Sequence, residues 1–143
     1  LVATPPAGER LSNLSGFRVL AIDDLEDARE GFLAILQVAG AQAETSASAQ
    51  AGLAALTRFK PEVVLCDIAM PEEDGFSFIR KVRKLEPGKG GKAQVIALTS
   101  YATAADARKA LDAGFDAHVA KPADAIELSR LIAKLSRRGK KRR

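Results

Sequence analysis

Acidic side chains, a hydroxyl group and a lysine stand where the short apolar runs of this sequence end. These residues are Asp23, Asp24, Asp67, Thr99 and Lys121. If the run ends meet, three carboxylates cluster, and two carboxylates ~4 Å apart repel by about 4 kcal/mol at an effective dielectric constant of roughly 20. A cation among them would relieve that repulsion. The donors are hard oxygen atoms without histidine or thiolate partners, which favours Mg²⁺ or Mn²⁺ over zinc.

The same residues include the groups that phosphoryl transfer requires. Asp67 offers a carboxylate nucleophile, and it is the expected phosphorylation site. Lys121 offers a positive charge and Thr99 a hydroxyl donor for the oxygens of a transferred phosphoryl group. We therefore predict Asp67, Lys121 and Thr99 as the catalytic residues.

Five strand-like segments alternate with five helical ones, and they must position these groups. Strands are expected at 17–23, 41–45, 62–67, 94–99 and 117–120. Helices are expected at 28–39, 53–59, 76–85 and 128–135, where apolar residues recur at spacings of three and four, and at 104–113, which ends against Gly114. Parallel strands need crossover helices, so this alternation predicts an α/β fold with a doubly wound parallel sheet. In such sheets a site forms at the carboxyl ends of the strands, where the five polar residues fall.

Composition fits one compact domain. The chain has 143 residues, of which 47% are apolar and 28% charged. No apolar stretch approaches the ~20 residues of a membrane span. The only cysteine, Cys66, cannot form an internal disulfide and is expected to be a buried apolar residue, so a cytoplasmic location is expected.

Three parts are expected along the chain: a linker at 1–15, the folded domain at 16–136 and a basic tail at 137–143. The start lacks Met and is rich in Pro, Gly and Ser, as in a linker within a longer protein. The tail holds six basic residues, and removing their charge from the net +4 leaves −2. No aromatic residue interleaves with them, so a solvated end is favoured over a nucleic-acid groove.

Four motifs in this order resemble the response-regulator receiver family of CheY-like domains. They are DD at 23–24, DIAMPEEDG at 67–75, ALTSYA at 97–102 and KP at 121–122. The resemblance covers about 17–135. It implies a flavodoxin-like (βα)5 sheet with strand order 2-1-3-4-5 and acceptance of a phosphoryl group from phosphohistidine.

The resemblance also implies a role for each site residue. Asp24, Asp67 and the backbone carbonyl of Ala69 would bind Mg²⁺ directly, and Asp23 would do so through water. Lys121 would contact the phosphoryl group, and its peptide bond to the following proline would be cis.

Thr99 and His118 would form the switch of the domain, by the same resemblance. The switch would act on a face formed by the fourth and fifth helices and the fifth strand, where a downstream protein would bind. The phosphodonor would be a histidine kinase or a histidine phosphotransfer protein. The chain most resembles the C-terminal receiver of a hybrid sensor histidine kinase, with a stand-alone response regulator as the alternative. No direct DNA contact and no membrane segment are expected. The sequence leaves open whether the chain forms a homodimer.

Other interpretations account for fewer of the residues. A Mg²⁺-dependent aspartyl-phosphate phosphatase of the haloacid-dehalogenase type needs an acid two residues after the nucleophile, where Ala69 stands. A dinucleotide-binding domain needs a glycine-rich turn after the first strand, and DDLEDAREG has none. A receiver-like module that is never phosphorylated would be expected to lack Asp67, Lys121 or one of the acidic pair. Taken singly, Asp24 could be a helix N-cap and Asp67 a turn residue.

Tyr101 occupies the variable position two residues after Thr99, beside the expected phosphoryl group. Its bulk is expected to hinder the hydrolytic water. The variant Tyr101→Ala should therefore lose its phosphoryl group faster than the wild type in a time course of phosphoprotein decay. An unchanged decay rate would contradict this role.

Overall fold

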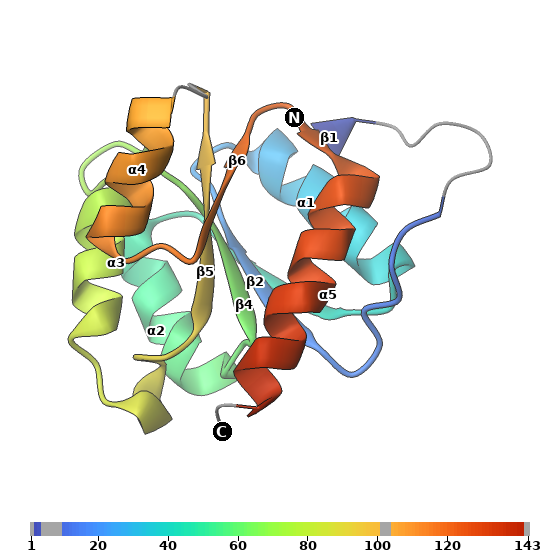
Figure 1. The fold of residues 1–143 in the computed structure, drawn as a ribbon, viewed down its shortest axis with the longest axis horizontal. Helices are drawn as coiled ribbons and strands as arrows, with labels where there is room; N and C mark the ends of the chain where they lie inside the picture. Colours follow the sequence, from blue (N-terminus) through green and yellow to red (C-terminus); the bar gives the residue numbers. More distant parts are fainter. Residues whose placement is uncertain (1, 4–9, 101–103, 142–143) are drawn as a thin grey trace.

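A five-stranded parallel sheet forms the centre of the computed structural model (Figure 1). The structure describes residues 2–3, 10–100 and 104–141, with the backbone alone at 2–3 and at 138–141. Its strands are β2 (Arg18–Ile22), β3 (Gln42–Ser46), β4 (Val63–Asp67), β5 (Gln94–Thr99) and β6 (Ala117–Ala120). The order β3-β2-β4-β5-β6 confirms the predicted order 2-1-3-4-5, and all neighbours are parallel.

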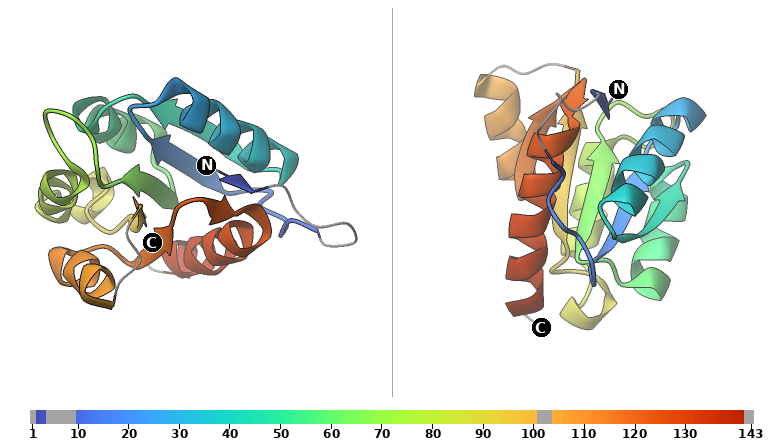
Figure 2. Two further views of the ribbon diagram at one scale, coloured as in Figure 1. Left: turned by 90° about the horizontal axis from the view of Figure 1, so that it is seen from above. Right: turned by 90° about the vertical axis from the view of Figure 1, so that its right-hand side faces the viewer.

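Five helices cover the two faces of the sheet. They are α1 (Glu26–Val38), α2 (Ala49–Phe59), α3 (Gly75–Arg83), α4 (Ala104–Ala113) and α5 (Ala125–Lys141), and a short 3-10 helix, η1 (Pro87–Lys89), precedes β5. Helices α1 and α5 pack on one face and α2, α3 and α4 on the other, as the view from above in Figure 2 shows. The predicted doubly wound architecture is confirmed.

The two faces of the sheet bury separate apolar layers. Val19, Leu65 and Ile96 lie under α1 and α5, and Leu20 and Val64 lie under α2 and α3. Every residue of β4 and β5 is buried, which explains why these strands read as nearly continuous apolar runs. Cys66 is fully buried, as expected.

Helix ends follow the local chemistry of the sequence. Gly40 (φ 96°) and Gly114 (φ 118°) follow the ends of α1 and α4 and adopt the left-handed conformation. Glycine adopts this conformation at a lower steric cost than any residue with a side chain. Leu25 is the N-cap of α1 and forms no side-chain cap bond, so Asp24 does not cap this helix. Asp124 accepts hydrogen bonds from the backbone N–H groups of Ile126 (2.9 Å) and Glu127 (3.0 Å), as the side chain of an N-cap residue does.

The N-terminal segment packs on the fold. Strand β1 (Val2–Ala3) pairs in parallel with β7 (Ala123–Asp124), just after the cis peptide bond between Lys121 and Pro122. The N–H of Leu14 donates to the Ala39 carbonyl (2.8 Å), and the fully buried Leu14 side chain joins the layer under α1 and α5. The linker boundary at residue 15 stays a prediction, but Leu14 already belongs to the packed body.

The structure also extends the last helix. The predicted apolar stripe ends at Leu135, whereas α5 continues as a helix to Lys141. The backbone therefore has no break at 137, where the basic tail was expected to begin. None of the helices in the described ranges has both the length and the apolar composition needed to cross a membrane.

Arg83 joins two loops at the edge where the strands begin. Its guanidinium donates to the carbonyls of Ala93 (2.7 Å) and Gly114 (2.9 Å) and to Asp116 (2.7 Å). Asp116 in turn accepts from the N–H of Val95 (2.7 Å). These bonds fix the start of β5 and the turn before β6.

Truncation of Leu14 should show that the N-terminal segment belongs to the core. Leu14→Ala removes buried methyl groups and leaves a cavity, so the free energy of unfolding in urea should fall by about 2–4 kcal/mol. Leu111→Ala is the matched control, because the Leu111 side chain is 52% exposed, and it should change stability by less than about 0.5 kcal/mol. Equal effects of the two changes would contradict the packing of this segment.

Candidate functional site

Three carboxylates meet at the carboxyl edge of the sheet. Asp23 and Asp24 follow β2, and Asp67 is the last residue of the neighbouring strand β4. One oxygen of each lies within 4.8 Å of the others. Asp23 and Asp67 are buried and Asp24 is half-buried. Two adjacent parallel strands ending side by side bring these acids together, as their positions in the sequence predicted.

Lys121 directly follows the edge strand β6, and its side chain reaches into this cluster. Its Nζ lies 3.2 Å from Asp23 Oδ2 and 3.3 Å from Asp67 Oδ2, and only 11% of its side chain is exposed. Its backbone N–H donates to the Thr99 carbonyl (2.7 Å), which ties the end of β5 to the residue after β6. Four of the predicted site residues thus surround one small volume.

Backbone groups and an arginine fix the orientation of the acids. Asp23 Oδ1 accepts from the N–H of Leu25 (3.0 Å), and Asp67 Oδ1 accepts from the N–H of Ala69 (3.2 Å). Arg29, on α1, donates to the Asp23 carbonyl (2.8 Å). The sequence did not predict Arg29, because a bond to a backbone carbonyl depends on tertiary placement and leaves no motif.

Burial and neighbouring charges oppose each other at Asp67. Burial raises the pKa of Asp67, Lys121 lowers it and the Asp23 charge raises it, and the net shift is upward. Burial also raises the pKa of the Cys66 thiol, with the Asp67 charge adding to the effect. Cys66 is therefore protonated and is not a nucleophile.

The donor set fits a hard divalent cation. Three carboxylate oxygens in one volume carry three negative charges against the single Lys121 ammonium, and a divalent ion would balance them. The cluster contains no histidine or cysteine, which argues against zinc. Ala69 lies two residues after Asp67, in the loop beside the cluster, and its carbonyl as a ligand stays a prediction.

Thr99 and His118 lie on neighbouring strands and point to the same face of the sheet. His118 pairs with Ala97 in the β5–β6 register, two positions before Thr99 on the same side. Thr99 is buried, and the buried His118 Nε2 has no hydrogen-bond partner in the described part of the chain. Tyr101, beside the expected phosphoryl group, lies outside the described residues.

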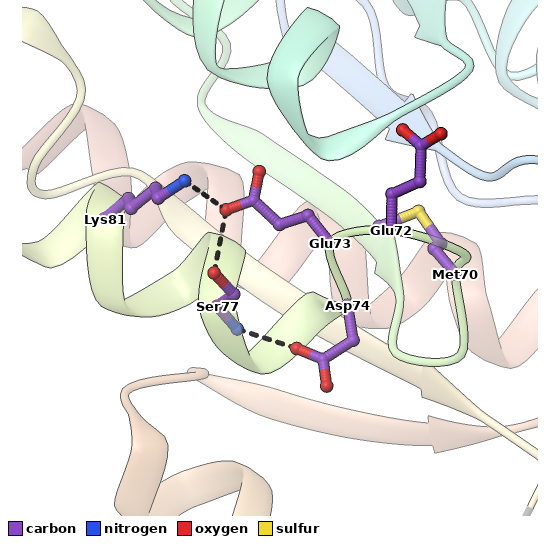
Figure 3. A pocket seen from close by; sticks show the side chains of 6 residues that line it. All are labelled: Met70, Glu72, Glu73, Asp74, Ser77 and Lys81. Carbon is purple, nitrogen blue, oxygen red and sulfur yellow. Dashed lines mark hydrogen bonds and ion pairs between the residues drawn. The ribbon is translucent and has the colours of Figure 1, made fainter.

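A polar pocket of about 580 Å³ flanks the loop that leads from Asp67 into α3 (Figure 3). Glu73 forms an ion pair with Lys81 and accepts a hydrogen bond from Ser77 Oγ (2.7 Å). Asp74 caps α3 by accepting from the N–H of Ser77 (2.9 Å). Lys81 and Ser77 lower the pKa of Glu73. These contacts hold the loop after Asp67 in place.

A family model described as the response regulator receiver domain matches residues 19–133. The chain belongs to the response-regulator receiver family. The match runs from the second residue of β2 to the first turns of α5, so it includes all predicted site residues. The resemblance carried by the four sequence motifs is confirmed.

Receiver relatives occur in proteins of very different length. The chain is 34% identical over 138 residues to hybrid signal transduction histidine kinase D of Dictyostelium discoideum, covering 92% of this chain but only 9% of that kinase. It is 38% identical over 122 residues to an uncharacterized 14.6 kDa protein of Leptolyngbya boryana, covering 85% of this chain and 92% of that protein.

Solved receiver structures share the fold. A receiver domain protein of Methanospirillum hungatei JF-1 is 29% identical with a TM-score of 0.77, covering 91% of this chain and 99% of its own. The receiver domain of a sensor histidine kinase from Pseudomonas aeruginosa PAO1 is 27% identical with a TM-score of 0.76, and the match covers 85% of this chain and 98% of that domain. The latter structure is described with a magnesium ion coordinated in its active-site cleft.

The raised pKa of Asp67 predicts that its ionised carboxylate costs stability in metal-free protein. Asp67→Asn should therefore melt at a higher temperature than wild type in EDTA at neutral pH. The pKa of Asp67 is higher in the folded than in the unfolded protein. The stability advantage of Asp67→Asn should therefore be complete above the folded-state pKa, shrink as the pH falls between the two pKa values and vanish below the unfolded-state pKa. Thermal melts across pH measure it.

Mg²⁺ provides the complementary control for this prediction. Added Mg²⁺ should raise the melting temperature of wild type and have little effect on Asp67→Asn. A variant that is less stable than wild type in EDTA at neutral pH would contradict the assigned electrostatics.

Proposed function

We propose that this chain accepts a phosphoryl group from phosphohistidine onto Asp67 in a Mg²⁺-dependent reaction and thereby switches a protein-binding face. The observation that carries the proposal is the position of Lys121, within 3.3 Å of Asp67 and 3.2 Å of Asp23 in a cluster of three acids. Membership of the receiver family supports it. The domain would catalyse its own phosphorylation and dephosphorylation.

Each residue has a defined part in the proposed reaction. An Asp67 carboxylate oxygen attacks phosphorus, the P–N bond to the donor imidazole breaks, and the imidazole leaves with the bonding electron pair and takes up a proton. Lys121 stays beside the acceptor and offsets the charge on the phosphoryl oxygens. Asp24, Asp67 and the Ala69 carbonyl would hold Mg²⁺, with Asp23 acting through water, and the bound ion would supply further positive charge.

The output of the reaction is a change in the population of two conformations. Thr99 is the expected reporter of charge at Asp67, and His118 follows on the neighbouring strand. The responding face consists of α4, β6 and α5, which corresponds to the fourth helix, fifth strand and fifth helix of the receiver fold. A downstream protein would bind there.

The wider context stays a proposal as well. Similarity to a hybrid histidine kinase favours the receiver of such a kinase as the setting, with a histidine kinase or phosphotransfer protein as donor. Similarity to a protein that the chain covers almost completely supports the stand-alone alternative. A cytoplasmic location fits both settings.

Phosphorylation can be tested with a small-molecule donor. Wild-type protein with acetyl phosphate and Mg²⁺ should gain the mass of one phosphoryl group in intact-mass spectrometry, and Asp67→Asn should gain none. Lys121→Ala should react at least about tenfold more slowly, since it loses the cation beside the acceptor oxygen.

Asp112→Asn is the matched control, because Asp112 is an exposed acid on α4 away from the cluster, and it should react like wild type. Phosphorylation of Asp67→Asn to the wild-type level, or of wild type equally well in EDTA, would overturn the proposed function.

A further inference from the structure

Helix α5 presents three basic side chains on its solvent side. Arg130, Lys134 and Arg137 are exposed and follow one another at spacings of four and three, so they lie on one face of the helix. We call these three residues the α5 basic stripe. Glu127, one turn earlier, is the exposed acid on this face.

The charges of the α5 basic stripe are not used within the described fold. The ion pairs and side-chain hydrogen bonds found among the described residues involve none of the three residues. Arg58, Lys81 and Arg83, in contrast, each pair with an acid. The stripe therefore contributes nothing visible to folding and stays available for a partner.

Further basic residues follow the stripe on the same helix. The α5 backbone is helical to Lys141, so Arg138, Lys140 and Lys141 stand on this helix rather than after a linker. From Arg130 to Arg143 the sequence holds eight basic residues and no acid. Removing their charge from +4 leaves −4 for residues 1–129, which makes this helix the positive pole of the molecule.

Two kinds of partner fit this surface poorly. The apolar face of α5, including Ile126, Leu128 and Ile132, is already buried in the core, so it is not available for insertion into a bilayer. Protein interfaces usually have an apolar or aromatic centre, and the solvent side of α5 lacks one. The described large apolar residues that are exposed lie elsewhere: Leu25 and Val38 at α1, and Leu111 on α4, the part of the proposed α4-β6-α5 face where a downstream protein would find an apolar contact.

Phosphate groups at regular spacing fit it better. From Arg130 to Lys141 the helix rises about 16 Å, and one strand of a duplex carries a phosphate about every 3.4 Å along its axis. No aromatic residue follows Ala125, so stacking on unpaired bases has no platform. A sequence-independent contact with a duplex backbone needs only the positive charges.

We propose that the α5 basic stripe binds the phosphate backbone of double-stranded nucleic acid without reading its sequence. This departs from the expectations of a merely solvated tail and of no direct DNA contact, because α5 continues as a helix as far as Lys141. In Figure 1 α5 runs from the catalytic edge toward the opposite end of the strands, so the bound duplex would lie away from Asp67. The activity is separate from the proposed phosphorylation.

The test is binding of the full chain to two fluorescent 20-base-pair DNA duplexes of unrelated sequence, measured by fluorescence anisotropy from 25 to 200 mM salt. Wild type should bind both duplexes with equal affinity, and the logarithm of the association constant should fall linearly with the logarithm of the salt concentration. The triple variant Arg130→Gln, Lys134→Gln, Arg137→Gln should bind at least about tenfold more weakly at 50 mM salt. Its salt slope should fall by about 2 to 3.

A matched triple variant separates the stripe from net charge alone. Arg80, Lys84 and Lys89 are exposed basic residues on α3 and η1. Changing these three to Gln removes the same charge and should weaken binding less than about twofold. An equal loss in both triple variants would overturn the proposal, as would the absence of binding by wild type at 25 mM salt.

Two further measurements separate DNA binding from membrane binding and from phosphorylation. Phosphatidylserine vesicles should bind the chain more weakly than the duplex, and a preference for vesicles would overturn the choice of partner. Asp67→Asn should bind DNA like wild type, and the stripe variant should accept a phosphoryl group from acetyl phosphate like wild type. Failure of the phosphorylation assay would therefore leave this proposal standing, and failure of DNA binding would leave the phosphorylation proposal standing.

Discussion

The attraction between Lys121 and two buried carboxylates is the interaction on which the site depends. Asp23 and Asp67 are buried side by side, and without a nearby cation their mutual repulsion and the loss of hydration would oppose folding. The Lys121 ammonium lies between them and offsets part of that cost. The remaining negative charge makes the cluster a suitable place for a divalent cation. Burial, with the Asp23 charge adding to it, keeps the pKa of Asp67 above its ordinary value.

The topology of the sheet provides this arrangement. Strands β2 and β4 are neighbours although α1, β3 and α2 separate them in sequence, so the acids at their ends become adjacent. Lys121 follows the edge strand β6 and crosses to the cluster, with its backbone held by the Thr99 carbonyl. The bulk of the protein is therefore a support that brings three strand ends within reach of one volume.

Most of the fold and of the site could be predicted from the sequence because each relevant residue stands at a strand end. Asp67 and Thr99 close completely buried strands, whose apolar runs are unmistakable. Strand β1 has two residues and therefore no periodicity, and Leu14 is surrounded by Ser, Asn and Gly that read as a linker. The continuation of α5 past Leu135 lacks an apolar stripe, so only the backbone reveals it.

The burial of Leu14 has a practical consequence for anyone dividing the protein into pieces. A fragment cut to the limits of the family match would start at Val19 and lack both Leu11 and Leu14. Apolar side chains between α1 and α5 would then face water, and such newly uncovered surface promotes self-association. Soluble, monomeric material should therefore come from fragments that begin before Leu11, even though these residues lie outside the span shared with the family.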